Sequence, residues 1–262
     1  MNVLITGAES RLGQVIAKEL AQGNRLRLWG DGEAPAGLVE GDEWFTGDVR
    51  DPDVAWRAVR DMQAIIHTGE PPGKLPDDDL ACEQTLLDLR TRGTHVLFKA
   101  GVEAGVKRFV YGSTLEVFEA YPDDVYISEM WRPMPSNDKF QLTRYLGEMT
   151  AREFARDFPV AVTVLRLGKL VVEEEVDGQE PDLMWVDYRD AAQAFRLALS
   201  RDAQSQLMWN RRFAVHHICA NIPNPKYLVG KMQYGFQLQG FEPQHNFESV
   251  WRGGDARKKC FF

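Results

Sequence analysis

The sequence predicts an α/β fold in which a doubly wound parallel sheet is flanked by helices and carries a small C-terminal lobe. Short apolar runs alternate with longer stretches of helical periodicity, an order typical of strand–helix–strand units. The first run, Val3-Leu4-Ile5, is apolar without interruption, as expected of a strand covered on both faces. A glycine-containing turn joins this run to the first helical pattern. These three observations predict a parallel sheet with helices on both sides.

The elements of the sheet and its helices follow one another in a regular order. Apolar residues between Leu12 and Leu20 recur at helical spacing, and Gly23 ends that helix. Asp51 before Pro52 is a helix start, because proline fits the first helical position. The other predicted elements are strands at 25–29, 44–46, 64–67, 108–111 and 160–167, and helices at 51–61, 78–104, with a break near Gly93, and 139–158.

The pattern changes after Leu167. An acidic segment at 173–181 predicts an exposed loop, followed by a helix at 188–200, a strand at 213–218 and a final helix at 226–239. We therefore expect a Rossmann domain at residues 1–167 and a small C-terminal substrate or cap region at residues 168–262 that packs on it. No internal repeat is visible.

The composition is that of an ordinary globular protein, with 44% apolar and 27% charged residues. The chain carries 31 Lys and Arg against 39 Asp and Glu, a net charge of −8, which argues against nucleic acid or an anionic membrane as a partner. It has no apolar run of transmembrane length and no basic leader, so we expect a cytoplasmic protein. Cys82, Cys219 and Cys260 are too few and too scattered for a disulfide framework or a metal site.

The turn from Thr6 to Gly13 lies between a strand and a helix, which is the context of a dinucleotide-binding fingerprint. Gly7 permits the tight turn and Gly13 lets the helix approach the sheet, while Ser10 stands at the middle glycine position. The helix N-terminus, which includes Arg11 and Leu12, offers free N–H groups to a pyrophosphate. An ordinary strand–helix turn is the alternative interpretation.

Asp31 follows the turn by about 20 residues, where an acidic side chain binds the ribose 2′-hydroxyl of a dinucleotide. A carboxylate there favours NAD, because the 2′-phosphate of NADP would meet a like charge. Arg11 is the opposing indication, since its guanidinium could reach a 2′-phosphate.

Four further stretches, at 47–51, 65–69, 105–111 and 187–192, resemble the extended short-chain dehydrogenase/reductase family, also called the NAD-dependent epimerase/dehydratase family. The short chain and the ending at 236–243 look most like the uronate dehydrogenase branch. The resemblance implies that Asp48 and Val49 lie near the adenine and that His67, Thr68 and Gly69 lie along the cofactor. It also implies a homodimer formed through the two long helices at 78–104 and 139–158.

The resemblance fails at the catalytic residues. The family uses a Ser or Thr, a Tyr that exchanges the substrate's proton, and a Lys that holds the nicotinamide ribose. Thr114, with Ser113 beside it, matches the hydroxyl position, but Phe140 and Arg144 stand where the Tyr and Lys are expected. Phenylalanine has no proton to exchange, and Arg144 is a permanent cation that still has donors for ribose hydroxyls. Arg90 replaces the usual Asn.

Features that recognise uronates are also replaced. Leu115-Glu116 stands where that branch has an Asn-His pair, and the acidic stretch 177–182 would repel a substrate carboxylate. His216-His217 lies on a predicted strand, where neighbours face opposite sides, so we expect one packed and one exposed ring.

Three functions remain open. The first is an NAD-binding protein on a sugar dehydrogenase/epimerase scaffold that lacks standard redox catalysis and acts as a sensor, a regulatory subunit or another pseudoenzyme. The second is an active NAD-dependent oxidoreductase or epimerase that uses Thr114, Glu116 or Tyr145 on an uncharged sugar-like substrate, although Tyr145 fits a packing role better. The third is a structural or partner-binding protein that holds no nucleotide.

Overall fold

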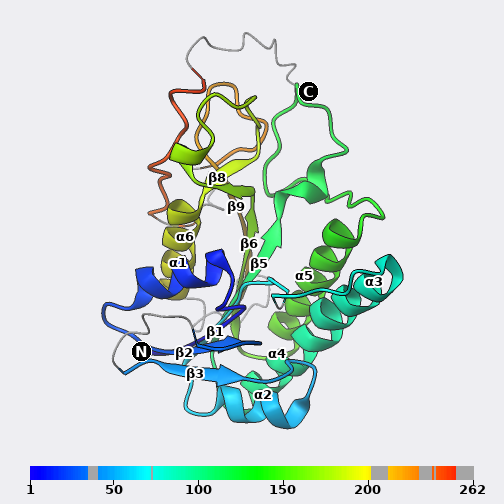
Figure 1. Cartoon of the computed structure of the whole chain (residues 1–262), viewed down its shortest axis with the longest axis vertical. Coiled ribbons are helices and arrows are strands. Elements are labelled where there is room, and N and C mark those ends of the chain that lie inside the picture. Colours follow the sequence, from blue (N-terminus) through cyan, green and yellow to red (C-terminus); the bar gives the residue numbers. More distant parts are fainter. Residues whose placement is uncertain (35–40, 72, 202–211, 230–237, 239, 252–262) are drawn as a thin grey trace.

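The fold is a seven-stranded parallel sheet between two layers of helices (Figure 1). The computed structural model describes residues 1–34, 41–71, 73–201, 212–229, 238 and 240–251. The strands run in the order β3-β2-β1-β4-β5-β6-β9 and all their pairings are parallel. They are β1 (Asn2–Thr6), β2 (Arg25–Gly30), β3 (Glu43–Thr46), β4 (Ala64–His67), β5 (Arg108–Thr114), β6 (Ala161–Leu167) and β9 (Phe213–Ile218).

Each face of the sheet carries its own apolar core. On one face lie α1 (Arg11–Leu20) and α6 (Tyr188–Ser200), and on the other α2 (Pro52–Val59), α3 (Asp79–Leu87), α4 (Thr94–Glu103) and α5 (Lys139–Asp157) (Figure 1). Successive strand residues point to opposite faces, so Val3 and Ile5 pack with Leu12 of α1, whereas Leu4 packs with Phe98 of α4. The uninterrupted apolar runs that predicted the sheet therefore contribute side chains to both cores.

The predicted break near Gly93 is a widened helical turn. The π-helical segment η1 (Asp88–Gly93) joins α3 directly to α4, so the region stays helical throughout. Gly147 of α5 lies against this turn, since an added Cβ there would come within 2.6 Å of the Arg90 carbonyl oxygen. The wide turn thus brings the Arg90 backbone close to α5.

Several local predictions need correction. Strand β5 continues to Thr114, three residues beyond the predicted end, and is followed by the 3₁₀ turn η2 (Leu115–Phe118). Two short strands, β7 (Lys169–Val171) and β8 (Trp185–Asp187), pair in parallel, and the predicted loop between them contains the 3₁₀ turn η3 (Glu173–Glu175). Their three-residue lengths leave too little periodicity to detect in the sequence.

The predicted final helix is wrong over its first four residues. Residues 226–229 are not helical, because the Ile127 N–H donates to the Lys226 carbonyl (2.7 Å) and the Leu228 N–H donates to the Ile127 carbonyl (2.9 Å). This pairing with a distant segment uses backbone groups that a helix would need. Residues 230–237 and 239 lie outside the described residues.

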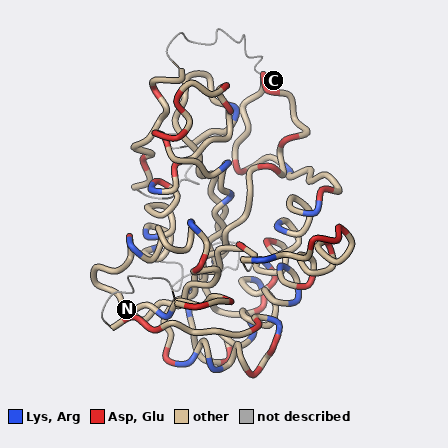
Figure 2. Tube along the Cα trace, in the orientation of Figure 1, with Lys and Arg blue, Asp and Glu red and all other residues tan. Residues whose placement is uncertain are grey.

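The chain beyond β6 contributes both to the sheet and to a cap. Strand β9 completes the sheet and α6 contacts α1, while β7, β8 and the described end of the chain gather beyond the carboxyl ends of β5 and β6 (Figure 1). The division near residue 167 stays a prediction. Basic and acidic positions are interspersed along the described chain (Figure 2). No helix among the residues that the structure describes has the length and apolar character to cross a bilayer.

Candidate functional site

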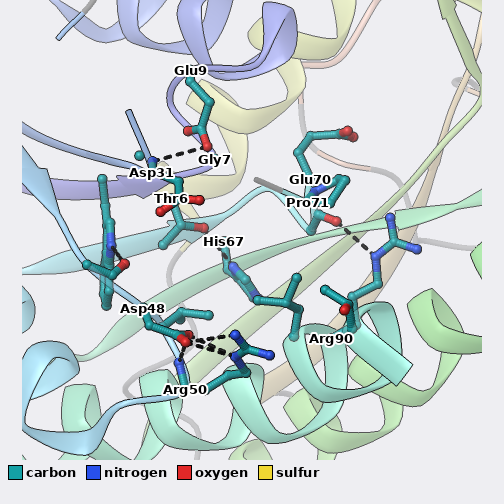
Figure 3. A pocket seen from close by; sticks show the side chains of 17 residues that line it. Thr6, Gly7, Glu9, Asp31, Asp48, Arg50, His67, Glu70, Pro71 and Arg90 are labelled. Atoms are coloured by element: carbon teal, nitrogen blue, oxygen red, sulfur yellow. Dashed lines mark hydrogen bonds and ion pairs between the residues drawn. The ribbon is translucent and has the colours of Figure 1, made fainter. Parts of the chain in front are cut away.

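A cavity opens at the carboxyl ends of β1, β2 and β4 (Figure 3). The strand order reverses between β1 and β4, and ligands of doubly wound sheets bind at such a switch point. The cavity is lined by Thr6, Gly7, Glu9, Trp29, Gly30, Asp31, Gly47, Asp48, Val49, Arg50, His67, Gly69, Glu70, Pro71, Thr85, Leu89 and Arg90. It therefore brings together predicted residues from four separate stretches of the chain.

The space around the turn requires glycine at both of its ends, at Gly7 and Gly13. Gly7 has φ +64°, and an added Cβ would lie 2.6 Å from Thr68 Oγ1. A Cβ on Gly13 would lie 2.3 Å from the Gly7 carbonyl oxygen, so only glycine lets α1 start this close to the turn.

Ser10 caps the helix that follows this turn. Its Oγ accepts a hydrogen bond from the Gly13 N–H (3.0 Å) and donates to the Gly7 carbonyl (2.7 Å). The first-turn amides of Arg11 and Leu12 have no intrahelical acceptor, so they are the groups that can bind an anion. The Leu12 side chain itself is buried in the core.

The end of the cavity near β2 is acidic. Asp31 follows β2, and its N–H donates to Glu9 Oε1 at 3.3 Å. Burial raises the pKa of Glu9. Glu9 is not among the residues predicted from the sequence, although a carboxylate inside a turn suited to an anion was a detectable signal.

Arg50, which lines the cavity, and Arg11 of α1 are each bound to a carboxylate. Arg50 binds both carboxylate oxygens of Asp48 at 2.8–3.0 Å, and these hydrogen bonds lower the pKa of Asp48. Arg11 pairs with Glu175 at 2.7 Å and lies 4.9 Å from the Tyr188 ring centre. Arg11 therefore points toward η3, not toward Asp31. Val49 lines the cavity beside Asp48.

His67 is a buried, neutral centre of a hydrogen-bond chain. Its Nδ1 lies 2.7 Å from Thr6 Oγ1 and its Nε2 lies 3.1 Å from Thr94 Oγ1. The Thr94 hydroxyl donates its proton to the Arg90 carbonyl and so can only accept from His67. We therefore assign His67 Nε2 as the donor and Nδ1 as the acceptor. Burial, followed by the charges of Arg90 and Arg144, lowers the pKa of His67 from 6.5 to about 3.

The loop after β4 is fixed by Thr68 and Gly69. The Thr68 hydroxyl donates to the Thr6 carbonyl (2.9 Å) and accepts from the Glu70 N–H (3.2 Å), and it does not line the cavity. Gly69 has φ +72°, and a Cβ there would lie 2.6 Å from the Gly112 carbonyl oxygen. Thr68 thus positions the loop, and Gly69 lets it pass close to β5.

Arg144 at the expected lysine position is bound to Glu70. Its Nη2 lies 2.6 Å from Glu70 Oε1, which joins α5 to the loop after β4. The buried Arg90 donates to the Gly69 carbonyl (3.1 Å) and to Thr143 Oγ1 (3.0 Å). Burial, followed by the charge of Arg144, lowers the pKa of Arg90 to about 10, so both guanidiniums stay charged at neutral pH. Glu70 is not among the residues predicted from the sequence.

Arg144 also lines a second cavity. Its lining is Ser113, Thr114, Glu116, Glu119, Asp138, Phe140, Gln141, Arg144, Leu167, Gly168, Lys169 and Leu170. The Phe140 ring stands here, 39% exposed, at the expected tyrosine position. Thr114 Oγ1 donates to Glu116 Oε2 (3.2 Å) and accepts from the Glu116 N–H (3.1 Å). The structure thus brings all four predicted catalytic positions to one cavity.

Ser113 is engaged by a buried ion pair. Its hydroxyl donates to Glu148 Oε2 (2.8 Å), and Glu148 is bound by Arg166 through two hydrogen bonds of 2.6 and 3.1 Å. Ser113 and Glu148 are fully buried, and Arg166 nearly so. Thr114 is therefore the freer of the two adjacent hydroxyls.

Other candidates lie apart from the cavities. Tyr145 packs against an apolar cluster with Leu115 and Val117, as a packing residue would. His216 and His217 are both buried, so the expectation that one ring is exposed is wrong; β9 is covered on both faces. Cys82 and Cys219 are buried free thiols, and no metal-binding group occurs among the residues that the structure describes.

The profile of the NAD dependent epimerase/dehydratase family matches residues 3–184, well over half of the chain. The chain belongs to this NAD-dependent epimerase/dehydratase family. The resemblance inferred from the short motifs is thereby confirmed, and so is the parallel α/β fold.

Several relatives and solved structures are similar to the chain at low sequence identity. NAD-dependent glucose-6-phosphate dehydrogenase of Haloferax volcanii is 26% identical over 226 residues, covering 79% of this chain and 83% of that protein. Uronate dehydrogenase of Pseudomonas syringae is 23% identical over 198 residues, covering 75% and 69%. A uronate dehydrogenase variant from Agrobacterium tumefaciens, solved with NAD, has a TM-score of 0.77 at 20% identity and covers 96% of this chain and 87% of its own. That likeness shows a shared fold.

Proposed function

We propose that this protein binds NAD(H) in the first cavity and lacks the standard hydride-transfer chemistry of its family, acting as a sensor, a regulatory subunit or another pseudoenzyme. The observation that carries the proposal is the pair of replacements in the second cavity, of which one, Arg144, is bound to Glu70 of the first cavity. The Phe140 ring stands at the acid–base position, and the Arg144 guanidinium beside it is bound to Glu70. Neither side chain can exchange a proton near neutral pH.

The first cavity fits a dinucleotide on its own geometry. Gly7 and Gly13 leave no room for a side chain at the turn. The Arg11 and Leu12 amides belong to the first helical turn and have no intrahelical acceptor. These amides would hold the pyrophosphate, Asp31 the adenosine ribose, and the region of Asp48 and Val49 the adenine. Bound NAD would supply the hydride acceptor that the protein itself lacks.

The charges around Asp31 favour NAD over NADP. Asp31 and Glu9 both line the end of the cavity near β2, and their carboxylates would repel a 2′-phosphate bound there. The arginines that could bind this phosphate are already paired, Arg11 with Glu175 and Arg50 with Asp48. The Arg11 interaction with a 2′-phosphate, which the sequence left open, loses support from this pairing.

The second cavity favours an uncharged, sugar-like ligand. Glu116, Glu119 and Asp138 line it, while its two cations are each held by an outside carboxylate. Arg144 pairs with Glu70 and Lys169 pairs with Asp182 at 2.7 Å. A substrate carboxylate would meet acidic side chains without a free cation, so a neutral sugar fits better than a uronate.

Titration calorimetry with NAD, NADH, NADP and NADPH, together with absorbance assays of hydride transfer on neutral and acidic sugars, tests the proposal. We expect NAD(H) binding with little or no turnover, because loss of a general acid–base group costs about 10²–10⁴-fold in rate. The double variant Phe140→Tyr with Arg144→Lys should raise turnover by more than it changes NAD affinity. Robust wild-type oxidation would refute the pseudoenzyme interpretation, and absence of all nucleotide binding would favour a structural role.

An active enzyme with a rebuilt site is the second candidate. The contact from Thr114 Oγ1 to Glu116 Oε2 places a hydroxyl beside a carboxylate within the second cavity. Such a pair can act as a general base, with the carboxylate accepting the proton of the hydroxyl. In that case Glu116→Gln should abolish turnover while leaving NAD affinity unchanged, and Glu119→Gln is the matched control in the same cavity.

A further inference from the structure

An ion pair joins the linings of the two cavities. Glu70 lines the first cavity and Arg144 lines the second, and Arg144 Nη2 lies 2.6 Å from Glu70 Oε1. No described residue lines both cavities. The first cavity therefore ends, on this side, at a contact that holds a residue of the second.

The ion pair stands between the glycine turn and the hydroxyl of Thr114. Strands β1, β4 and β5 are neighbours in that order, and Gly7 follows β1, Glu70 follows β4 and Thr114 ends β5. A Cβ on Gly7 would lie 3.2 Å from the Glu70 Cβ, so Glu70 packs against the turn. Figure 3 shows Glu70 across the cavity from Asp31. An extended ligand that ran from the turn to Thr114 would therefore cross the end of β4, where Glu70 binds Arg144.

The surrounding contacts fix this pair in place. The side chains of Arg144 and Glu70 are only 13% and 22% exposed, so solvent screens their attraction less than that of a surface pair. Burial lowers the pKa of Arg144, but the charge of Glu70 and its hydrogen bond outweigh this effect and raise the pKa overall. Beside the pair, Arg90 of the first cavity donates to the Gly69 carbonyl (3.1 Å) and to the Phe140 carbonyl (3.3 Å). The loop after β4 is thus tied to α5 by two arginines.

The adenosine diphosphate part of a dinucleotide does not have to pass this contact. In the proposed site its adenine lies near Asp48 and its pyrophosphate at the first-turn amides of α1, on the side of the glycine turn. Only the second ribose and the nicotinamide would have to cross the end of β4. Their passage would separate two largely buried opposite charges and leave the Glu70 carboxylate beside the negative pyrophosphate.

We propose that the Glu70–Arg144 ion pair makes the first cavity a site for an adenosine diphosphate group, from ADP or from the ADP half of NAD, and keeps the nicotinamide half out of the second cavity. The inference rests on the proposed dinucleotide site. While the pair is intact, NAD gains no affinity from its nicotinamide half, so the protein recognises an adenine nucleotide and not the redox-active ring.

Titration calorimetry with ADP and NAD on wild type, Glu70→Gln and Glu70→Ala tests the inference, with melting temperatures confirming that the variants fold. Wild type should bind NAD no more tightly than ADP. Both variants remove the charge that holds Arg144, so the nicotinamide half can enter. The affinity for NAD relative to ADP should then rise about tenfold, which is about 1.4 kcal/mol. A mere loss of negative charge would instead favour ADP, the more highly charged ligand, at least as much as NAD.

NADH fluorescence reports the position of the nicotinamide, because the emission of the reduced ring shifts to shorter wavelength when the ring leaves water. NADH bound to wild type should emit as it does in free solution. NADH bound to Glu70→Ala should emit at shorter wavelength, since its ring can then enter the second cavity.

Glu175→Gln is the matched control. It releases Arg11 from another ion pair beside the same turn, 2.7 Å long, and neither of these two residues lines a cavity of the site. Its affinities for ADP and NAD should change by equal factors. The inference is overturned if wild type binds NAD more tightly than ADP, or if both Glu70 variants change the two affinities equally. A wild type that binds neither ligand would overturn the dinucleotide site as well, which separates the two failures.

Discussion

The buried neutral His67 should make folding stability depend on pH in a defined window. Its pKa in an unfolded chain is 6.5 and in the folded protein is about 3, so the unfolded state binds more protons below 6.5. The stability contributed by keeping this ring neutral is complete above pH 6.5 and is lost as the pH falls toward 3. Linkage at one pKa unit per 1.36 kcal/mol gives a total of roughly 5 kcal/mol, of which about 2 kcal/mol is lost by about pH 5.

His67→Gln removes the titrating ring and retains a donor and an acceptor for Thr6 and Thr94. Urea unfolding followed by tryptophan fluorescence should show the variant less stable than wild type near pH 7.5, since two buried hydrogen bonds are perturbed. Near pH 5 the gap between the two free energies of unfolding should narrow by about 2 kcal/mol. His95→Gln, at an exposed position on α4, is the control and should follow the wild type. An equal gap at both pH values would refute the assignment of His67 as buried and neutral.

Two further predictions concern the buried ion pair and the assembly. Arg166→Met should destabilise the protein by about 3–5 kcal/mol in urea unfolding, because the buried Glu148 would lose its cationic partner. Adding Glu148→Met should recover part of that loss, and strictly additive costs would contradict the coupling. Light scattering at micromolar concentration should give the mass of a homodimer paired through α3, α4 and α5, where Leu80 and Leu142 are 62% and 37% exposed. Leu142→Glu should shift the measured mass to that of the monomer. A monomeric wild type would remove that proposal.

The sequence predicts those parts of the fold that depend on local periodicity. The strand that begins near Val3 and the helix start at Asp51 and Pro52 are confirmed. Both depend on residues that are neighbours in the sequence, an apolar run in one case and a capping residue in the other. The failure at 226–229 has the opposite origin. There a distant backbone segment at Ile127 takes the hydrogen bonds, and no local pattern encodes that partner.

In the candidate site too, residues set by local spacing could be predicted, and pairs distant in the sequence could not. The glycine turn and Asp31 were predictable from spacing along the chain, and the structure places them at one cavity. The pairing of Arg144 with Glu70 joins residues 74 positions apart, and the pairing of Arg166 with Glu148 joins α5 to β6. Such pairs depend on which elements become neighbours in space, so the charge of each residue alone could not reveal them.

The π-helical turn at 88–93 has a consequence for how this protein can vary. A π turn holds one more residue than an α turn, and here it aims Arg90 at the Gly69 carbonyl while α4 keeps its apolar face on the sheet. Deleting one residue would restore an α-helix and rotate everything on one side of the deletion by about 100°. Either Arg90 would lose its contact with the loop after β4 or Phe98 would leave the core. This segment should therefore accept exchanges at its exposed positions, Asp88 and Arg92, but no change of length, and insertions or deletions selected in a random library should avoid it.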